Sequence, residues 1–327
     1  MKKKLLFQSM LVLELRVLLR SKWLLSFLIL FIGLAFLLYF YGLESAKNTA
    51  VPVTDGMIAE TGGMRLAVGN LDPAYFGLEE IKDTSAVYDA DGRLTDETLT
   101  NAYSRSIAML INLSLWILPI ICLILGTNSI VADKEEGRFA LYRTYQSPMI
   151  YYLLSKYAAL SISLVISLGL SYGIFGLFLY VKGALADAAM FGIFLGLNLF
   201  IVLVFSGLAV LIGSLSVTRM QGLSLALFAW SFLVFVYEFI IFSIINQIAY
   251  GQKLTAMFWF ILANPIESVR VWAIDQLGAN YIFGPQYLIL NEWGAKGTLS
   301  LYFFLSIFII ILLSLSLSAL VIKRRMA

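Results

Sequence analysis

The stretch DKEEGRFALYRTYQSP, residues 133–148, is a densely charged segment between two long apolar runs. Its first eleven residues contain three acids and three bases, and the segment ends in a proline. Charged side chains are costly in the hydrocarbon of a bilayer, so this segment must lie in a loop at one membrane face. The apolar runs on either side of it are therefore predicted to cross a membrane.

The composition excludes several classes of protein. Apolar residues make up 61% of the 327 residues, charged residues only 13%, and the mean hydropathy is +0.89, which indicates a polytopic membrane protein. Cys122 is the only cysteine, so no disulfide can form within the chain. The absence of histidine excludes histidine metal sites, Ser-His and Cys-His nucleophile pairs and HExxH metalloproteases. No metal site is expected.

The predicted fold is all-α, with six membrane-spanning helices. The predicted spans are residues 23–43, 106–132, 157–181, 188–215, 220–252 and 297–322. Two spans contain small-xxx-small pairs, Gly169 with Gly173 and Gly192 with Gly196, which are expected to let helices approach closely.

The segments outside the spans differ in character. Residues 1–22 begin with three lysines and then place Ser9, Arg16 and Arg20 on one face of a largely apolar segment. This pattern predicts an interfacial helix on the cytoplasmic surface, and the rival interpretation is a cleaved signal peptide. Residues 44–105 are rich in acids, Gly, Pro, Thr and Asn, and are predicted to form a small extracytoplasmic domain.

The region before the last span is predicted to enter the membrane without crossing it. The apolar stretch 254–263 has only ten residues, which is too short to span a bilayer. Residues 253–296 are therefore predicted to form a re-entrant or interfacial helix followed by an extracytoplasmic segment. Residues 323–327 form a basic tail.

The distribution of basic residues predicts the orientation. With both termini, residues 133–156 and Arg219 inside, the cytoplasmic pieces hold 14 of the 23 Lys and Arg residues but only four of the 20 acids. The positive-inside rule then places both termini in the cytoplasm. The predicted location is the cytoplasmic (inner) membrane, which the chain crosses several times.

The chain lacks the means to power transport by itself. No GxxxxGK[ST] motif occurs, which excludes a P-loop ATPase site. Ion-coupled carriers place several ionisable groups in the membrane, whereas Glu238 is the only one within a predicted span. These exclusions favour a partner P-loop ATPase. ATP and magnesium are expected on that partner, and no cofactor is expected on this chain.

The charged segment has a form that suits such a contact. Gly137 can end the helix of the second span, and Arg138 and Arg143 remain available for polar contacts. Aromatic residues recur at three-residue spacing on one side: Phe139, Tyr142 and Tyr145. A short amphipathic helix of this kind can dock in a groove of a soluble subunit, and an ordinary loop with snorkelling charges fits the composition equally well.

A family resemblance favours the first interpretation. The segment EEGRFALY at 135–142, followed by Ser147-Pro148 and Lys156, resembles the cytoplasmic stretch of ABC-2 type permeases. The order of segments along the chain is similar as well. NPIESVR at 264–270 resembles the NPx(D/E)xxR stretch of the branch associated with multicopper-enzyme and nitrous-oxide-reductase maturation.

The resemblance implies a set of coupling residues. In ABC-2 permeases the corresponding stretch is the coupling helix that docks on the ATPase. Carried over to this chain, the ATPase-coupling residues are Asp133, Glu135, Glu136, Gly137, Arg138, Phe139, Tyr142, Arg143 and Pro148.

Two further groups of residues are candidates for the transport path. Glu238 is either a pathway residue or a structural carboxyl bonded to Asn112 or Asn198, and all three are pathway candidates. The candidates for an extracytoplasmic gate are Asn264, Pro265, Glu267 and Arg270. Glu267 and Arg270 are three residues apart, a spacing that suits an ion pair across one helical turn.

These inferences predict the permease subunit of an ATP-driven ABC-2 type exporter. It is expected to work in the lipid bilayer as a dimer, in the simplest form a homodimer, with a separate ATPase subunit. An extracytoplasmic accessory protein is a further candidate partner, and no nucleic acid is expected. The alternative is a membrane scaffold or assembly factor that acts through residues 44–105. The substrate stays open, although the resemblance suggests a role in metalloenzyme maturation.

Overall fold

The computed structural model describes residues 2–20, 22–48, 96–139, 149–185, 187–277 and 298–326. Every regular element among these residues is helical. Six helices or helical runs are long and apolar enough to cross a membrane, as predicted. They are α2 (Lys22–Asn48), α3 (Asp96–Glu135), α5 (Met149–Val181), α6 (Ala188–Leu215), the run α7–η3–α8 (Arg219–Ser231, Phe232–Val236, Tyr237–Ile245) and α12 (Leu299–Met326).

Several helices extend beyond the apolar runs that predicted them. α3 begins at Asp96, ten residues before the expected start of the second span, and α5 begins at Met149 rather than at residue 157. Polar side chains attach the added end of α3 to its neighbours: the Tyr103 hydroxyl donates to the Asp187 carbonyl (2.6 Å), and the Arg105 guanidinium donates to Ser45 Oγ (2.8 Å). The ends of the predicted domain 44–105 are therefore helical, while residues 49–95 lie outside the described part.

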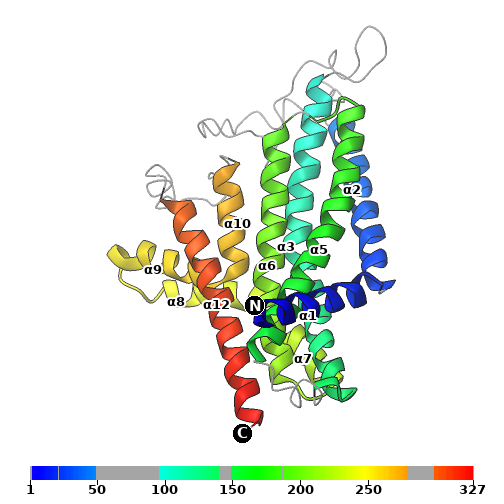
Figure 1. The fold of residues 1–327 in the computed structure, drawn as a ribbon. Coiled ribbons are helices and arrows are strands. Elements are labelled where there is room, and N and C mark those ends of the chain that lie inside the picture. Colours follow the sequence, from blue (N-terminus) through cyan, green and yellow to red (C-terminus); the bar gives the residue numbers. More distant parts are fainter. Residues whose placement is uncertain are drawn as a thin grey trace, which may run out of the picture.

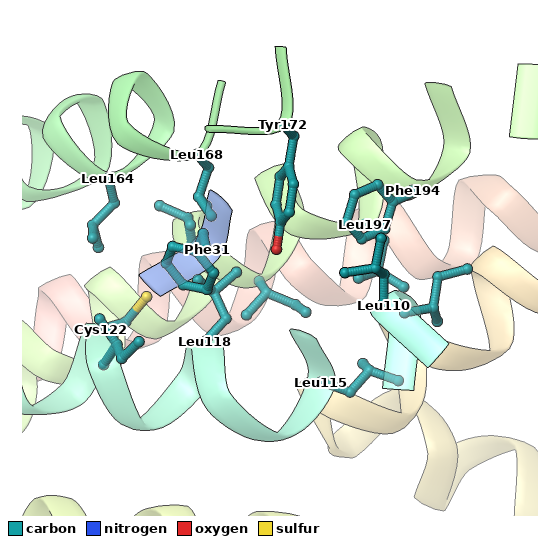
Figure 2. Packing of buried hydrophobic residues seen from close by; sticks show 14 of the residues in the cluster. Phe31, Leu110, Leu115, Leu118, Cys122, Leu164, Leu168, Tyr172, Phe194 and Leu197 are labelled. Atoms are coloured by element: carbon teal, nitrogen blue, oxygen red, sulfur yellow. The ribbon is translucent and has the colours of Figure 1, made fainter. Parts of the chain in front are cut away.

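The core lies where α2, α3, α5 and α6 meet. Figure 2 shows Phe31 of α2, Leu118 of α3 and Tyr172 of α5 converging beside Phe194 of α6. The Tyr172 ring packs edge-on against Phe194, with 4.7 Å between centroids. Lipid tails are as apolar as these side chains, so this packing stabilises the bundle through van der Waals contact more than through exclusion of water.

Small residues allow close helix packing, at one of the expected positions and at others. A Cβ atom at Gly196 would lie 3.1 Å from the Trp272 ring of the helix at residues 265–276, whereas one at Gly169, Gly173 or Gly192 would meet no heavy atom within 4 Å outside its own helix. Further close approaches are at Gly126 of α3, which faces Ala209, and at Gly213 of α6, which faces Ile130. The spacing of small residues alone does not say which face meets a neighbour.

The fifth span is interrupted. α7 continues through the π-helical turn η3 into α8, which ends at Ile245 rather than at residue 252. Two helices follow, α9 (Tyr250–Ala263) and α10 (Pro265–Gln276). The break between them falls at Asn264, which is extended (φ −102°, ψ 117°) because the following proline disfavours a helical conformation there.

The two helices after the fifth span take different directions. In Figure 1, α9 projects to one side while α10 stands beside α6 and α12. Residues 265–276 lie in the segment 253–296, for which a single short helix was predicted, and they form a second helix. The re-entrant path itself stays a prediction.

Helix α1 (Lys2–Leu19) lies across the bundle. Figure 1 shows it roughly perpendicular to the upright helices, and its main packing partner is α5. This direction suits the predicted interfacial helix, although its position at a membrane surface stays a prediction.

Candidate functional site

The candidate site begins where α3 ends, within the charged segment of residues 133–148. Gly137 has a left-handed backbone conformation (φ +73°), and its N–H donates to the Lys134 carbonyl (3.3 Å). Glycine adopts this conformation without steric cost and commonly follows the last helical residue. The predicted break in the second span is therefore confirmed, and the last turn of α3 carries Asp133, Lys134 and Glu135.

Asp133 is buried and bonded on several sides. Its side chain is 2% exposed, and its Oδ2 lies 2.7 Å from Lys156 Nζ and accepts a hydrogen bond from the Tyr152 hydroxyl (2.8 Å). Its Oδ1 lies 3.3 Å from Arg138 Nε. A buried carboxylate is costly unless it is paired and hydrogen-bonded, and both conditions are met here.

Lys156 joins this carboxylate to α1. Its ammonium lies 2.7 Å from Glu14 Oε2, also donates to Ser129 Oγ (3.1 Å), and is 5% exposed. We call the set Glu14, Asp133, Arg138, Tyr152 and Lys156 the Lys156 hub. It contains two acids and two bases, so its charges balance, and it connects α1, the end of α3 and the start of α5.

Lys134 points to a different helix. Its ammonium donates to three carbonyls at the C-terminal end of α6, those of Gly213 (2.7 Å), Ser214 (2.8 Å) and Ser216 (2.7 Å). The last carbonyls of a helix lack partners within it and carry the negative end of its dipole. Lys134 therefore caps α6 with a positive charge.

Glu135 places a negative charge at the N-terminal end of the next helix, α7. Its carboxylate accepts from the backbone N–H of Arg219 (2.8 Å) at the start of α7, and also lies 2.7 Å from Arg219 Nε. A negative charge at a helix N-terminus is favourable. Glu136 is half exposed and lies between Arg138 (2.6 Å) and Arg219 (3.3 Å).

Successive residues at the end of α3 thus bond in different directions. Because residues of a helix are about 100° apart around its axis, neighbours in sequence face different surroundings. Asp133 bonds to α5, Lys134 to α6 and Glu135 to α7. A displacement of the end of α3 would therefore act on the same end of three other helices, and through Lys156 on α1 as well.

The remaining predicted coupling residues are only partly described. Phe139 packs edge-on against Tyr152, with 5.8 Å between ring centroids. Arg138 was expected to be available for contacts; it is paired with Asp133 and Glu136, and 41% of its side chain stays exposed. Burial lowers the pKa of Arg138, but these two carboxylates outweigh that effect and raise it. Tyr142, Arg143 and Pro148 lie outside the described residues.

A second charged cluster surrounds Arg270. The Arg270 guanidinium lies 2.5 Å from Glu267 Oε2 on its own helix, which confirms the predicted ion pair, and 3.6 Å from Glu238 Oε1 on α8. We call these three residues the Arg270 cluster. Glu267 is buried, and burial raises its pKa although Arg270 acts in the opposite direction. Glu238 is 42% exposed at its side chain.

Asn264 connects the same two parts of the chain. Its Oδ1 accepts from the N–H of Ile266 (3.0 Å) and so caps α10, and its Nδ2 donates to the Leu233 carbonyl in the π-helical turn (2.9 Å). A π-helical turn leaves carbonyls displaced from their regular partners, and such turns occur frequently at functional sites. Pro265 occupies the first turn of α10, where its missing N–H costs nothing.

The two asparagines proposed as partners of Glu238 lie elsewhere. Asn112 donates to the Ala108 carbonyl (3.1 Å) and Asn198 to the Phe194 carbonyl (2.7 Å), each within its own helix. Glu238 is brought to Arg270 instead. Among the residues that the structure describes, no group of three or more Asp, Glu or Cys side chains is placed to hold a metal ion.

Sequence reasoning missed several members of this site. Lys134, Tyr152 and Arg219 were not singled out, and Glu14 was only counted among the cytoplasmic acids. One signal was present: Glu14 is the only acid in the first 22 residues, and Lys156 is a lone base within an apolar stretch. Their partnership across 142 positions is visible only in the folded chain.

Comparison with known proteins gives two findings. The family model described as ABC-2 family transporter protein matches residues 9–324. The chain is also 26% identical over 170 residues to the probable ABC transporter permease protein NosY of Pseudomonas aeruginosa. That alignment covers 51% of this chain and 62% of the relative.

Proposed function

The chain belongs to the ABC-2 family of transporter proteins, and we propose that it is the permease subunit of an ATP-driven exporter that uses a separate ATPase. The family match and the six apolar helical segments make it a multi-pass membrane protein of the ABC permease type. The chain itself lacks a P-loop. Its role is therefore to form the path and to move in response to the partner.

The observation that carries the proposal is the set of contacts at the end of α3. The charged segment leads directly from the predicted ATPase-docking residues into bonds with α5, α6 and α7. The ionic groups at this joint are paired, and Glu14, Asp133 and Lys156 are also buried, so a load applied to residues 133–148 would move several helices together. We propose that the closing ATPases supply this load.

The proposed orientation places the Lys156 hub and both termini at the cytoplasmic face of the cytoplasmic membrane. The excess of Lys and Arg in the corresponding segments supports it. One chain has six spans, so we propose that two copies form the path between them, with two ATPase subunits below. An accessory protein at residues 44–105 is a further proposed partner.

The Arg270 cluster is proposed as part of the outer gate. Asn264 and Arg270 both contact the α7–η3–α8 run from α10, through the Leu233 carbonyl and through Glu238. Opening the path would then require α10 and α8 to separate at the contact between Arg270 and Glu238, which is the more exposed of the two contacts. Asn112 and Asn198 stay pathway candidates.

A role in metalloenzyme maturation is proposed on similarity alone. It rests on the NPIESVR stretch and on the likeness to a probable permease named NosY. We propose no specific substrate.

The test is native co-purification in mild detergent with assay of magnesium-dependent ATP hydrolysis. Wild type is compared with a Glu136→Ala/Gly137→Ala variant and with Lys182→Ala, an exposed base on the α5–α6 turn that serves as the control. We expect a P-loop ATPase to co-purify with wild type and the control, and the double variant to lose the partner or its stimulated hydrolysis. A folded preparation without any bound ATPase would support the scaffold alternative instead.

A further inference from the structure

The π-helical turn η3 leaves one carbonyl of the fifth span without a donor from its own helix. The Tyr237 N–H donates to the Phe232 carbonyl, five residues back, and the regular four-residue pattern resumes in α8. When a helix returns from five-residue to four-residue spacing, one carbonyl is passed over. Counting from the Tyr237 bond, that carbonyl belongs to Leu233.

The break between α9 and α10 supplies the missing donor. Asn264 is buried, and its Nδ2 donates to the Leu233 carbonyl (2.9 Å). In the other direction, the Tyr237 hydroxyl donates to the Phe260 carbonyl (2.9 Å) in the last turn of α9. The last carbonyls of a helix also need donors from outside it. Two helix interruptions therefore satisfy each other's carbonyls, and we call these two hydrogen bonds the η3 latch.

Release of the η3 latch has a defined structural consequence. An unpaired carbonyl in apolar surroundings is costly, so the Leu233 carbonyl needs another donor when Asn264 leaves. The Tyr237 N–H is four residues further along the chain, and a bond between them would turn η3 into regular α-helix. This change shifts α8 by one residue position relative to α7, which is a rotation of about 100° and a translation of about 1.5 Å.

The packing of α8 permits this rotation. Among the described side chains of α8 only Ile241 is buried, and Phe239 is 76% exposed. Glu238 lies 3.6 Å from Arg270, and a rotation of about 100° would carry it to another side of the helix. We propose that η3 is a two-state element. Its π form holds Glu238 against Arg270, and its α form turns Glu238 away.

The two-state turn deepens the proposed outer gate, because it names the movement by which α8 and α10 would separate. Its link with transport rests on the proposed function. The turn itself needs neither an ATPase nor a substrate, so it can be measured on the purified chain in lipid nanodiscs. Failure of the transport proposal would therefore leave the two-state turn standing.

The test is the distance between spin labels on α8 and α5 of the full-length chain, measured by pulsed electron paramagnetic resonance. The labels are attached at Phe239→Cys and Leu170→Cys, two exposed positions, in a Cys122→Ala background that removes the only native cysteine. The latch variant is Tyr237→Phe/Asn264→Ser. It removes both donors of the η3 latch and keeps a side chain that can cap α10.

Three further chains give the comparison. Asn128→Ser/Tyr180→Phe makes the same two substitutions at exposed positions outside the latch and is the control. Deletion of Val236, an exposed residue of η3, removes one residue from the π-helical turn and fixes the α form. Deletion of Leu227, a similarly exposed residue in the regular helix α7, is the matched control for that deletion.

We expect mainly one distance in wild type and in the control, and a second distance in the latch variant that differs from the first by about 5 Å or more. The chain without Val236 should show this second distance alone and should unfold at a higher temperature than the chain without Leu227. A latch variant with only the wild-type distance would overturn the proposal, and so would a second distance that the chain without Val236 does not share. Equal destabilisation by the two deletions would overturn it as well, because η3 would then contain no residue that the helix can lose.

Discussion

Lys156 and Arg270 each lie between two acids, and their surroundings differ in burial. Lys156 lies 2.7 Å from both Glu14 and Asp133, and all three side chains are at most 5% exposed. Arg270 lies 2.5 Å from buried Glu267 but 3.6 Å from Glu238, whose side chain is 42% exposed. A base between two acids therefore makes a rigid joint in one place and a separable contact in the other.

The physical reason is the cost of leaving a charge without a partner. In a buried site this cost is several kcal/mol, so the three hub elements move together or not at all. As part of the proposed gate, Glu238 would face the water of the path, where water replaces the lost partner and the contact contributes only about 0–1 kcal/mol. This contrast suits a transporter that transmits force at one end and opens at another.

The largest effect is expected from Lys156→Met. It leaves Glu14 buried without a base, so the free energy of unfolding should fall by about 3–5 kcal/mol. The measurement is denaturant or thermal unfolding of the purified chain in detergent. The control is Lys182→Met, an exposed lysine at a turn, for which a change within about 0.5 kcal/mol is expected. Equal stability of the two variants would show that the hub is not a rigid joint.

A smaller effect is expected from Glu14→Gln. Lys156 keeps Asp133 and Ser129 as partners, so only one charge-assisted bond is lost, which corresponds to about 1.5–3 kcal/mol. The loss should be local to α1. Amide hydrogen exchange should therefore increase in α1 and stay unchanged in α10; a uniform increase along the chain would contradict the assigned role.

The corresponding change in the Arg270 cluster, Arg270→Met, is expected to lower the free energy of unfolding by less than Lys156→Met does. Arg270→Met leaves buried Glu267 without its partner, but this carboxyl can take up a proton instead of staying charged, which limits the cost to about 1–3 kcal/mol. Burial already raises the pKa of Glu267, and removal of Arg270 raises it further. A carboxyl with a raised pKa in the folded state loses stability as pH rises, so the destabilisation should shrink when pH falls from about 8 to about 5.

Unfolding measured at both pH values checks this expectation. Glu267→Gln in the Arg270→Met background is the matched control, because it removes the titrating group. The pH dependence should then disappear, and its persistence would assign it to another residue.

The contrast between the two clusters also shows what the sequence could predict. The helix end at Gly137 and the Glu267–Arg270 pair depend on residues close in sequence, and both were predicted. The six apolar segments followed from hydropathy, whereas the polar first turns of α3 did not, because their partners lie on other helices. Sequence patterns therefore predicted contacts between residues that are close in sequence, and not contacts between helices.

No sequence pattern predicted the bonds between residues of the site that are far apart in sequence. Lys134 was known as part of the charged segment, but its contact with the end of α6 depends on how α3 packs against α6. For Glu238, a bond to Asn112 or Asn198 was the alternative to a pathway role. Its partner Arg270 lies on α10, a helix within the predicted re-entrant and extracytoplasmic segment 253–296.

The smallest stability effect is expected from Glu238→Gln, and this makes it the most informative change for function. The contact with Arg270 is 3.6 Å long, and in the proposed gate Glu238 faces the water of the path, so the free energy of unfolding should change by no more than about 1 kcal/mol. If Glu238 is part of the gate, substrate-dependent ATP hydrolysis of the complex should change severalfold while folding does not. Glu135→Gln serves as the comparison at the coupling end, because it loses a partly exposed ion pair with Arg219. Unchanged hydrolysis in Glu238→Gln, together with a loss in Glu135→Gln, would assign movement to the cytoplasmic end alone and remove the Arg270 cluster from the gate.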